Sequence, residues 1–510
     1  RSVYSSFVER EVSTVVAMLT MVDWLLVAVG LLAACYWYLS WNMSYWRARG
    51  VYTLPGALPG VGHMLDALLL RRGVQTICIQ AYHNIETKGQ PAVGLYLFRQ
   101  PVLMLKDPDL IQTVLIKEFS SFHDNALQVD DEVDPYVSRN PFITRGQRWK
   151  TLRQKLSPAF SPARMKVIFP LIQAVGQEFN KYMRKHLNEN INLNHVTGLF
   201  TSEVVAKCAF GLDGNAFNDL DTPFYQHGRK IWDGTLNSPF ESFLIFLIPS
   251  INKILKRSFF PKETAEFFED VIKQAIEYRQ KAPDKVADND FLQFLINLHN
   301  KNEFGLIDVV AQCLTFFTDG FETSSLTASF ALYELTMNPD IQESLRQEVL
   351  ATESFNYESI TSLPLLDRVL QETLRKYGVF TMTKECSKDF TLQADGRSFP
   401  IKKGQHVVVP VNAIQNDPNI YPNPDKFDPD RFLPENIKTR HPISFMGFSA
   451  GPRTCIGNKF AACQIKVLLA NILTNFKLVK CNKTAEKLKL NPLLPLPVVE
   501  GGIWLQFQEL

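Results

Sequence analysis

One cysteine near the end of the chain has the surroundings of a reactive thiolate. Cys455 lies in the run FSAGPRTCIG at residues 448–457, and a helical pattern follows it over residues 458–476. Backbone N–H groups at the start of a helix point toward such a sulfur and stabilise its anionic form. A thiolate held in this way can be an axial ligand of iron.

An arginine and two alternative interpretations accompany this cysteine. Arg453 supplies a planar guanidinium whose parallel N–H groups suit a carboxylate, as a haem propionate would present. Taken alone, Cys455 could instead be an inert packing residue, as most buried cysteines are. It could also bind zinc with Cys463 and His441, but the chain offers no closely spaced ligand pair.

A second polar group interrupts an apolar helical pattern in the middle of the chain. The periodicity predicts one helix over residues 307–337, ended by Asn338-Pro339, with a length of about 45 Å at ~1.5 Å per residue. Asp319, Glu322 and Thr323 lie near its midpoint among phenylalanines. Because a buried carboxylate is costly unless it is paired or used, we interpret these residues as functional rather than as a solvated face.

Both groups need a large folded body to bring them together. The 510 residues are 46% hydrophobic and 21% charged, which is an ordinary globular balance. The pattern at residues 92–105 predicts a β-hairpin, residues 390–409 form a second β-rich stretch, and the remaining periodicity is helical. We therefore predict a mainly α fold with small β-sheets (α+β), in one domain over residues 63–510.

Charge and cysteine usage narrow the class of protein. The net charge of +2, from 54 basic and 52 acidic side chains, creates no global field that would attract a nucleic acid. The eight cysteines are scattered singly, without the spacing of a disulfide framework or a zinc ribbon. This usage indicates a reducing, cytosol-facing location.

The N-terminal region has the composition of a membrane anchor. No charged side chain occurs over residues 24–46, and roughly 20 apolar residues are enough for a helix to cross the hydrocarbon layer. Arg47 and Arg49 follow the run, which places the rest of the chain on the cytosolic side. We expect either a translated leader or a native N-terminus at residues 1–20, a transmembrane signal anchor at 21–46 and a basic, proline-rich hinge at 47–62.

Three tryptophans near the end of the run, Trp37, Trp41 and Trp46, are expected to lie at the membrane interface. The alternative is a cleaved secretory peptide. It is disfavoured because the apolar run is long and no small-residue cleavage site follows it.

The run from Phe448 to Gly457 resembles the haem-binding signature of the cytochrome P450 family, which places Phe, Gly, Arg, Cys and Gly at these spacings. Other landmarks of the family follow its usual order over nearly the whole chain after the anchor, and the anchor and hinge are similar to those of microsomal members. The resemblance implies the cytochrome P450 fold, with the long helix lying over haem b (iron protoporphyrin IX). It implies that Cys455 is the iron ligand and that Phe448, Arg453 and Gly457 help to bind the cofactor.

Two further landmarks carry the resemblance. The segment WKTLR at residues 149–153 is similar to the helix at the haem edge, and this resemblance implies that Trp149 and Arg153 are propionate ligands. Glu372 and Arg375 in the segment ETLR resemble a structural pair that is locked by a downstream arginine, here Arg431. The implied role of this triad is to hold the loop that leads to Cys455.

The segment DGFETS at residues 319–324 resembles the oxygen-activation motif, in which a small residue and a glycine open a kink over the iron. The resemblance implies that Thr323 hydrogen-bonds bound oxygen and that Glu322 relays protons. Asp319 departs from the family, which has Ala or Gly there. Its carboxylate could narrow the pocket, pair with a polar group of the substrate or rotate away.

The turn over residues 377–384 also departs from the family pattern, because it lacks the usual prolines. Lys384 stands where the family has an arginine two residues before a cysteine. It keeps the positive charge but not the planar fork, so its expected propionate contact is weaker.

The resemblance implies a monooxygenase of the endoplasmic reticulum membrane whose catalytic domain faces the cytosol. It would insert one oxygen atom from O2 into a lipophilic small molecule, either a xenobiotic, as in the insect microsomal members it most resembles, or an endogenous lipid or hormone. By analogy, the pocket is lined by residues 125–142, 313–317, 379–383 and 493–502, which are mostly apolar or aromatic.

No nucleotide-binding glycine loop accompanies the haem motif in the sequence. Electrons are therefore expected from NADPH through a separate flavoprotein, the NADPH-cytochrome P450 reductase, with cytochrome b5 as a second candidate partner. Two alternative functions remain, a haem-thiolate isomerase or lyase and a non-catalytic haem-binding protein. The presence of Glu322 and Thr323 argues against the first, and Asp319 leaves room for the second.

Overall fold

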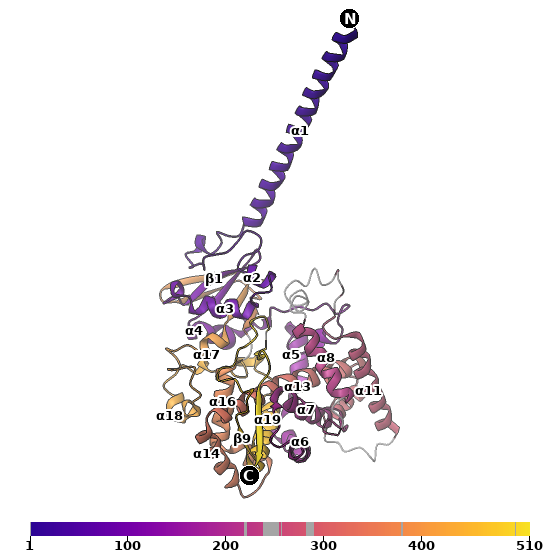
Figure 1. Cartoon of the computed structure of the whole chain (residues 1–510), viewed down its shortest axis with the longest axis vertical. Helices are drawn as coiled ribbons and strands as arrows, with labels where there is room; N and C mark the ends of the chain where they lie inside the picture. Colours follow the sequence, from indigo (N-terminus) through magenta and orange to yellow (C-terminus); the bar gives the residue numbers. More distant parts are fainter. Residues whose placement is uncertain are drawn as a thin grey trace.

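The computed structural model describes residues 2–218, 222–237, 254, 256, 258–281, 290–378, 381–494 and 496–510. The fold is mainly helical with small sheets, as predicted (Figure 1). Its helices are α1 (Ser2–Ser40), α2 (Leu65–Leu68), α3 (Val74–His83), α4 (Pro108–Gln112), α5 (Gly146–Leu156), α6 (Pro162–Arg184), α7 (Leu193–Val205), α8 (Pro223–Asn237), α11 (Lys262–Lys281), α12 (Phe291–Asn300), α13 (Leu306–Met337), α14 (Pro339–Leu350), α15 (Tyr357–Ser362), α16 (Pro364–Lys376), α17 (Val411–Gln415), α18 (Pro434–Ile437) and α19 (Asn458–Asn475).

The strands are short and form three sheets. They are β1 (Ala92–Leu97), β2 (Gln100–Leu105), β3 (Asp124–Asn125), β4 (Ile191–Asn192), β5 (Met382–Glu385), β6 (Phe390–Ala394), β7 (Arg397–Ile401), β8 (His406–Val409), β9 (Phe476–Val479) and β10 (Trp504–Glu509). The largest sheet has the order β1-β2-β8-β5-β3, and only the β2–β8 pair is parallel. The predicted hairpin and the second β-rich stretch are both confirmed, the latter as β6, β7 and β8.

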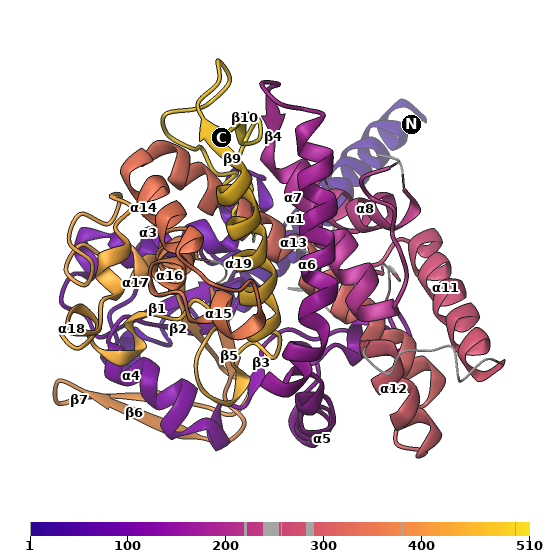
Figure 2. The ribbon, with the colours of Figure 1, turned by 90° about the horizontal axis from the view of Figure 1, so that it is seen from below.

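Helix α13 is the centre of the helical part and confirms the predicted long helix. Its first turn is capped because the Asp308 carboxylate accepts the Gly305 N–H at 3.0 Å. It ends at Met337 because Pro339 lacks the N–H that would continue the helical bonding. Seen from below, α6, α7, α13 and α19 lie side by side, and α8, α11 and α12 lie on one flank (Figure 2). Helix α13 contacts α7 and α19 directly.

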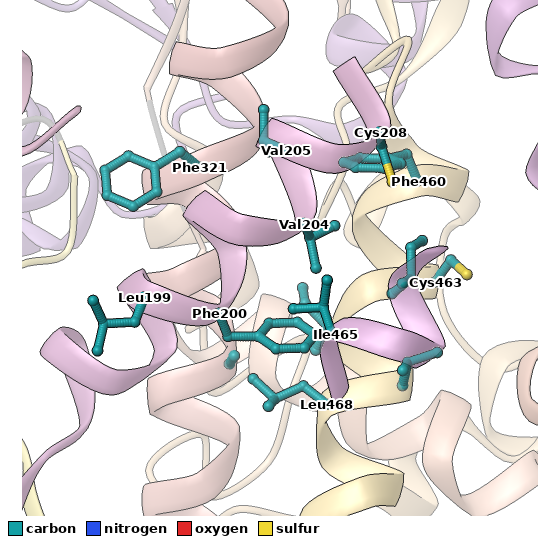
Figure 3. Packing of buried hydrophobic residues seen from close by; sticks show 14 of the residues in the cluster. Leu199, Phe200, Val204, Val205, Cys208, Phe321, Phe460, Cys463, Ile465 and Leu468 are labelled. Carbon is teal, nitrogen blue, oxygen red and sulfur yellow. The ribbon is translucent and has the colours of Figure 1, made fainter. Parts of the chain in front are cut away.

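The packing between these helices forms the main hydrophobic core. Phe200 of α7 and Ile465 and Leu468 of α19 are buried there, and Phe321 of α13 and Phe460 of α19 lie nearby in the same close view (Figure 3). Close packing of large apolar side chains from three helices fixes their relative positions. It therefore fixes the place of α13 relative to the start of α19, which directly follows Cys455.

A second hydrophobic cluster lies beneath the largest sheet. The loop over residues 448–457 connects the two clusters, because Phe448 and Ile456 pack against the helical core and Ala450 packs against the cluster of the sheet. Cys455 therefore lies at the boundary between the two parts of the body.

The N-terminal helix α1 projects from the body (Figure 1). Residues Met21–Ser40 are long and apolar enough to cross a membrane, with a mean hydropathy of 1.7. The helix ends at Ser40, however, and Trp46 is fully buried in the body. Its indole N–H donates to the Leu95 carbonyl of β1 at 3.1 Å. The expectation that Trp46 lies at the membrane interface is therefore wrong, since the tryptophan fills a gap in the sheet that Gly94 leaves open.

The segment expected to be a hinge is bonded to the body. Thr53 forms a parallel bridge with Gly94, and Gly62 forms an antiparallel bridge with Leu97. The Gly60 N–H donates to the Leu39 carbonyl of α1 at 3.0 Å. These bonds attach the end of α1 to the edge of the largest sheet.

Candidate active site

The loop that carries Cys455 is held by hydrogen bonds between its own residues. The Cys455 N–H donates to the Phe448 carbonyl at 2.9 Å, and the Thr454 hydroxyl donates to the same oxygen at 3.0 Å. Gly451 has a φ of 71°, and a Cβ there would lie 2.1 Å from the Leu115 carbonyl oxygen. Only glycine fits this position. The Gly457 N–H, at the start of α19, donates to the Cys455 sulfur and favours its thiolate.

The surroundings of the sulfur suit a bound iron porphyrin. The Cys455 side chain is exposed, yet burial is the main cause that raises its thiol pKa. Both observations hold if the sulfur faces an internal space enclosed by protein. The charge of Asp319 on α13 also raises this pKa, so the space lies between Cys455 and α13. An enclosed space with one hydrogen-bonded thiolate donor fits a haem with an axial sulfur ligand.

Arg453 and Trp149 lie together. The Arg453 guanidinium lies 4.0 Å from the centre of the Trp149 ring. It also donates to Asp124 Oδ1 at 3.2 Å and to three backbone carbonyls, those of His123 (2.8 Å), Pro141 (2.9 Å) and Thr144 (3.0 Å). Burial lowers its pKa to about 10. These bonds use four of its five N–H groups, which leaves one N–H of Nη1 for a propionate.

Two more cations lie close to this loop. Arg153 of α5 donates to the Thr454 carbonyl at 2.9 Å, and the Cys455 charge opposes the fall in its pKa that burial causes. Lys384 of β5 is buried and donates to Asn125 Oδ1 at 2.9 Å. Burial lowers the Lys384 pKa to about 7, and the positive charge of Arg453 adds to this shift. Because Lys384 and Arg453 are buried near each other and repel, binding of an anion between them would be favourable. A haem propionate is such an anion.

The polar motif of α13 divides between two faces of the helix. Asp319, whose charge affects Cys455, and Thr323 lie one turn apart, and the Thr323 hydroxyl donates to the Asp319 carbonyl at 2.6 Å. The Asn140 side-chain amide donates to the Asp319 carboxylate at 3.1 Å. Burial raises the Asp319 pKa to about 6. The helix is unbroken here, and the Gln464 amide of α19 donates to the Gly320 carbonyl at 3.1 Å.

Glu322 lies on the neighbouring face, beneath α8. It is buried, and both of its carboxylate oxygens lie 3.3 Å from Nη1 of Arg229. The structure therefore brings Asp319 toward Cys455, whereas Glu322 is held by Arg229 of α8 and Thr323 lines a pocket between α13, α16 and the C-terminal loop. Arg229 and Asn140 were missed by sequence reasoning, because each pairs with α13 across many residues and belongs to no recognisable motif.

The structural triad is assembled. Glu372 and Arg375 are completely buried and are joined by hydrogen bonds of 2.7 and 3.0 Å. Arg431 Nε lies 3.4 Å from the same carboxylate, and the Asp428 N–H donates to it at 2.9 Å. Arg375 also donates to the Pro424 carbonyl at 2.7 Å. The carboxylate thus ties helix α16 to the segment over residues 424–431, which precedes the Cys455 loop.

An apolar pocket begins beside Thr323. It is lined by Thr323, Leu326, Thr327, Phe330, Thr373, Leu374, Tyr377, Leu496 and Pro497, from α13, α16 and the C-terminal loop. Of the expected lining segments, residues 493–502 contribute Leu496 and Pro497, and residues 125–142 supply Asn140 next to Asp319. Cys313 is instead a buried core residue. Val379 and Phe380 lie outside the described residues.

Comparisons with known proteins agree with this arrangement. The family model described as Cytochrome P450 matches residues 54–501. The chain is 33% identical to "Cytochrome P450 6k1" of Blattella germanica, over 95% of this chain and 97% of that protein. It is 35% identical to "Probable cytochrome P450 6a13" of Drosophila melanogaster, over 97% and 99%. It is 32% identical to "Cytochrome P450 6A1" of Musca domestica, over 92% and 95%.

Proposed function

Because the chain belongs to the cytochrome P450 family and is therefore a haem-binding monooxygenase, we propose that it inserts one oxygen atom from O2 into a lipophilic small molecule. Its electrons come from NADPH through a separate flavoprotein reductase, with cytochrome b5 as a second candidate donor. One observation carries the proposal: the Cys455 sulfur accepts the Gly457 N–H and lies close enough to Asp319 of α13, one helical turn before Thr323, to be affected by its charge.

When bound, haem supplies the oxygen and electron chemistry. Cys455 would hold it from one side as a thiolate, and the Gly457 N–H limits how much charge the sulfur donates. Arg453, Arg153 and Lys384, with the Trp149 indole, form the cationic group that would hold its propionates.

The residues of α13 would handle protons. Thr323 now donates to the helix backbone, and rotation of its side chain would turn the hydroxyl toward the internal space. Glu322 is a buried acid one residue away whose charge is balanced by Arg229. Release of this ion pair would let Glu322 accept a proton from the α8 side and pass it toward Thr323.

The proposed location follows from α1. A helix that can cross a bilayer joins the catalytic body directly, and Arg47 and Arg49 flank it on the body side. These features support an anchor in the endoplasmic reticulum membrane with the body in the cytosol. The apolar pocket supports a lipophilic substrate, such as a xenobiotic or an endogenous lipid or hormone.

The decisive experiment combines a spectrum with turnover. The reduced, carbon-monoxide-bound protein is expected to show the strongly red-shifted Soret band of thiolate ligation, and Cys455→Ala is expected to abolish it. With reductase, NADPH and O2, the wild type should form an oxygenated product. Thr323→Ala should keep the band but divert electrons to hydrogen peroxide. A protein with the band that acts on peroxides without reductase would be the isomerase or lyase, and one with no turnover at all would be a haem-binding protein.

A further inference from the structure

Asp319 is the one acid of α13 that faces the internal space beside Cys455 without a role in the proposed function. It stands at the position of the motif where the resemblance implies a small residue. Its side chain is exposed to that space, and one oxygen accepts the Asn140 amide at 3.1 Å. Asn140 is itself held, because its side-chain oxygen accepts the Phe142 N–H at 2.7 Å.

No cation of the described part of the chain neutralises this carboxylate. None of the ion pairs among the described residues includes Asp319, whereas Asp308 and Glu322 of the same helix pair with Arg139 and Arg229. The Asn140 amide is neutral and satisfies only part of an ionised carboxylate.

Apart from Asn140, Cys455 and Thr323, Asp319 has apolar side chains of α13 before and after it along the helix. On α13, Phe316 precedes it and packs on Phe460 with ring centres 4.9 Å apart. One helical turn beyond, at about 5.4 Å, Thr323 opens the pocket whose walls include Leu326 and Phe330. A single negative group one helical turn from a pocket with five apolar lining residues favours a ligand with a cationic head and an apolar body.

We propose that Asp319 is a specificity-determining residue that binds the ammonium group of a lipophilic amine substrate, whose apolar body extends along α13 into the pocket beside Thr323. This inference rests on the proposed monooxygenase function and names its substrate class. The carboxylate contributes an ion pair that the buried site otherwise lacks, and Asn140 holds it in the orientation that receives the ligand.

The test compares two probes that differ only in charge. Phenylbutyl-trimethylammonium is permanently cationic and cannot ligate iron through nitrogen, and its neutral isostere has a carbon in place of the nitrogen. Binding of both to the haem-loaded protein is measured by equilibrium dialysis, which does not depend on turnover. Wild type is expected to bind the cation about ten-fold more tightly than the isostere.

Asp319→Asn keeps the shape and is expected to lose this preference by weakening the cation alone, with affinity for the isostere unchanged. Asp340→Asn removes an exposed acid at the start of the neighbouring helix α14 and is the matched control. It should leave both affinities as they are. Equal affinities of the wild type for the two probes would overturn the inference, whatever the variant does, and so would a preference retained by Asp319→Asn.

The same samples separate this inference from the proposed function. If the red-shifted Soret band or the oxygen-dependent turnover is missing, the proposed function fails. If both are present and the wild type does not distinguish the probes, only the assignment of an amine substrate fails.

Discussion

The buried carboxylate of Glu372 gives the sharpest test of how the Cys455 loop is held. In Glu372→Gln, the side chain keeps its size but loses the negative charge that faces Arg375 and Arg431. Arg375 is completely buried and retains only carbonyl and amide oxygens, including Gln415 O at 2.9 Å and Pro424 O at 2.7 Å. Its charge would be left without a counterion. Loss of one partner of a buried ion pair costs about 3–5 kcal/mol.

The assay is urea unfolding followed by tryptophan fluorescence, together with the reduced carbon monoxide spectrum. We expect Glu372→Gln to lower the free energy of unfolding by this amount and to lose the red-shifted band, because the segment over residues 424–431 is released. Glu343→Gln is the matched control. Glu343 pairs with Arg346 at the same spacing, at 3.0 Å; Arg346 is buried and donates to the Leu473 and Phe476 carbonyls, but the Glu343 side chain is 58% exposed, so water reaches the carboxylate. Water screens such a pair, so its unfolding midpoint should not change.

A double-variant cycle completes this test. Arg375→Gln alone should also be strongly destabilising, because it leaves the buried carboxylate with only Arg431 and the Asp428 N–H. The double variant should lose clearly less than the sum of the two single losses. If Glu372→Gln resembles Glu343→Gln, or if the two losses simply add, the carboxylate does not hold the loop through its charge.

Three further predictions concern other contacts. Burial raises the pKa of Asp319 in the folded state to about 6 from the ordinary 3.8, so the free energy of unfolding falls as pH rises through this range. Ligand-free Asp319→Asn should therefore melt at a higher temperature than wild type at about pH 8 and at the same temperature at about pH 4. A difference in melting temperature that does not depend on pH would contradict this cause. Arg229→Leu removes the guanidinium that lies 3.3 Å from the buried Glu322 carboxylate and should lower the free energy of unfolding by about 1–3 kcal/mol. In urea unfolding, the double variant with Glu322→Leu should recover most of this loss. No recovery would mean that the broken ion pair is not the cause. Gly94→Val would place a Cβ 2.4 Å from the Trp46 ring, so it should lower the free energy of unfolding by about 1–3 kcal/mol. Displacement of Trp46 should also shift the tryptophan fluorescence to longer wavelength. Unchanged emission would refute this account of Trp46.

Local patterns predicted the elements that carry the site. The long apolar periodicity that ends at Asn338-Pro339 corresponds to α13, and the hairpin and the helix after Cys455 were equally visible, because helix and strand periodicity and proline punctuation are local properties. The family pattern predicted that Glu372, Arg375 and Arg431 lie together. Their contacts follow this expected arrangement.

Contacts between distant segments were not predictable. The partner of Glu322 is Arg229 on α8, and the partner of Asp319 is Asn140 in a loop; neither pairing has a sequence signal, since it depends on how α8 and the loop pack on α13. Trp46 was assigned to the membrane because its neighbours are uncharged, although composition does not distinguish a residue in lipid from one in a protein core. The bonds that Arg453 donates to the His123 and Pro141 carbonyls also had no sequence signal, and its expected contact with a propionate stays a prediction.

The burial of Trp46 determines where the chain can be cut to obtain a soluble enzyme. A truncated chain that begins at residue 41 lacks α1 but keeps the buried Trp46 packed against Gly94. It also keeps the β-bridge between Thr53 and Gly94. A cut placed at residue 47, after the whole uncharged run, would leave an indole-sized hole in the first strand pair. This shorter enzyme would be less stable, although the removed residues 24–46 are all uncharged and have the composition of a membrane anchor.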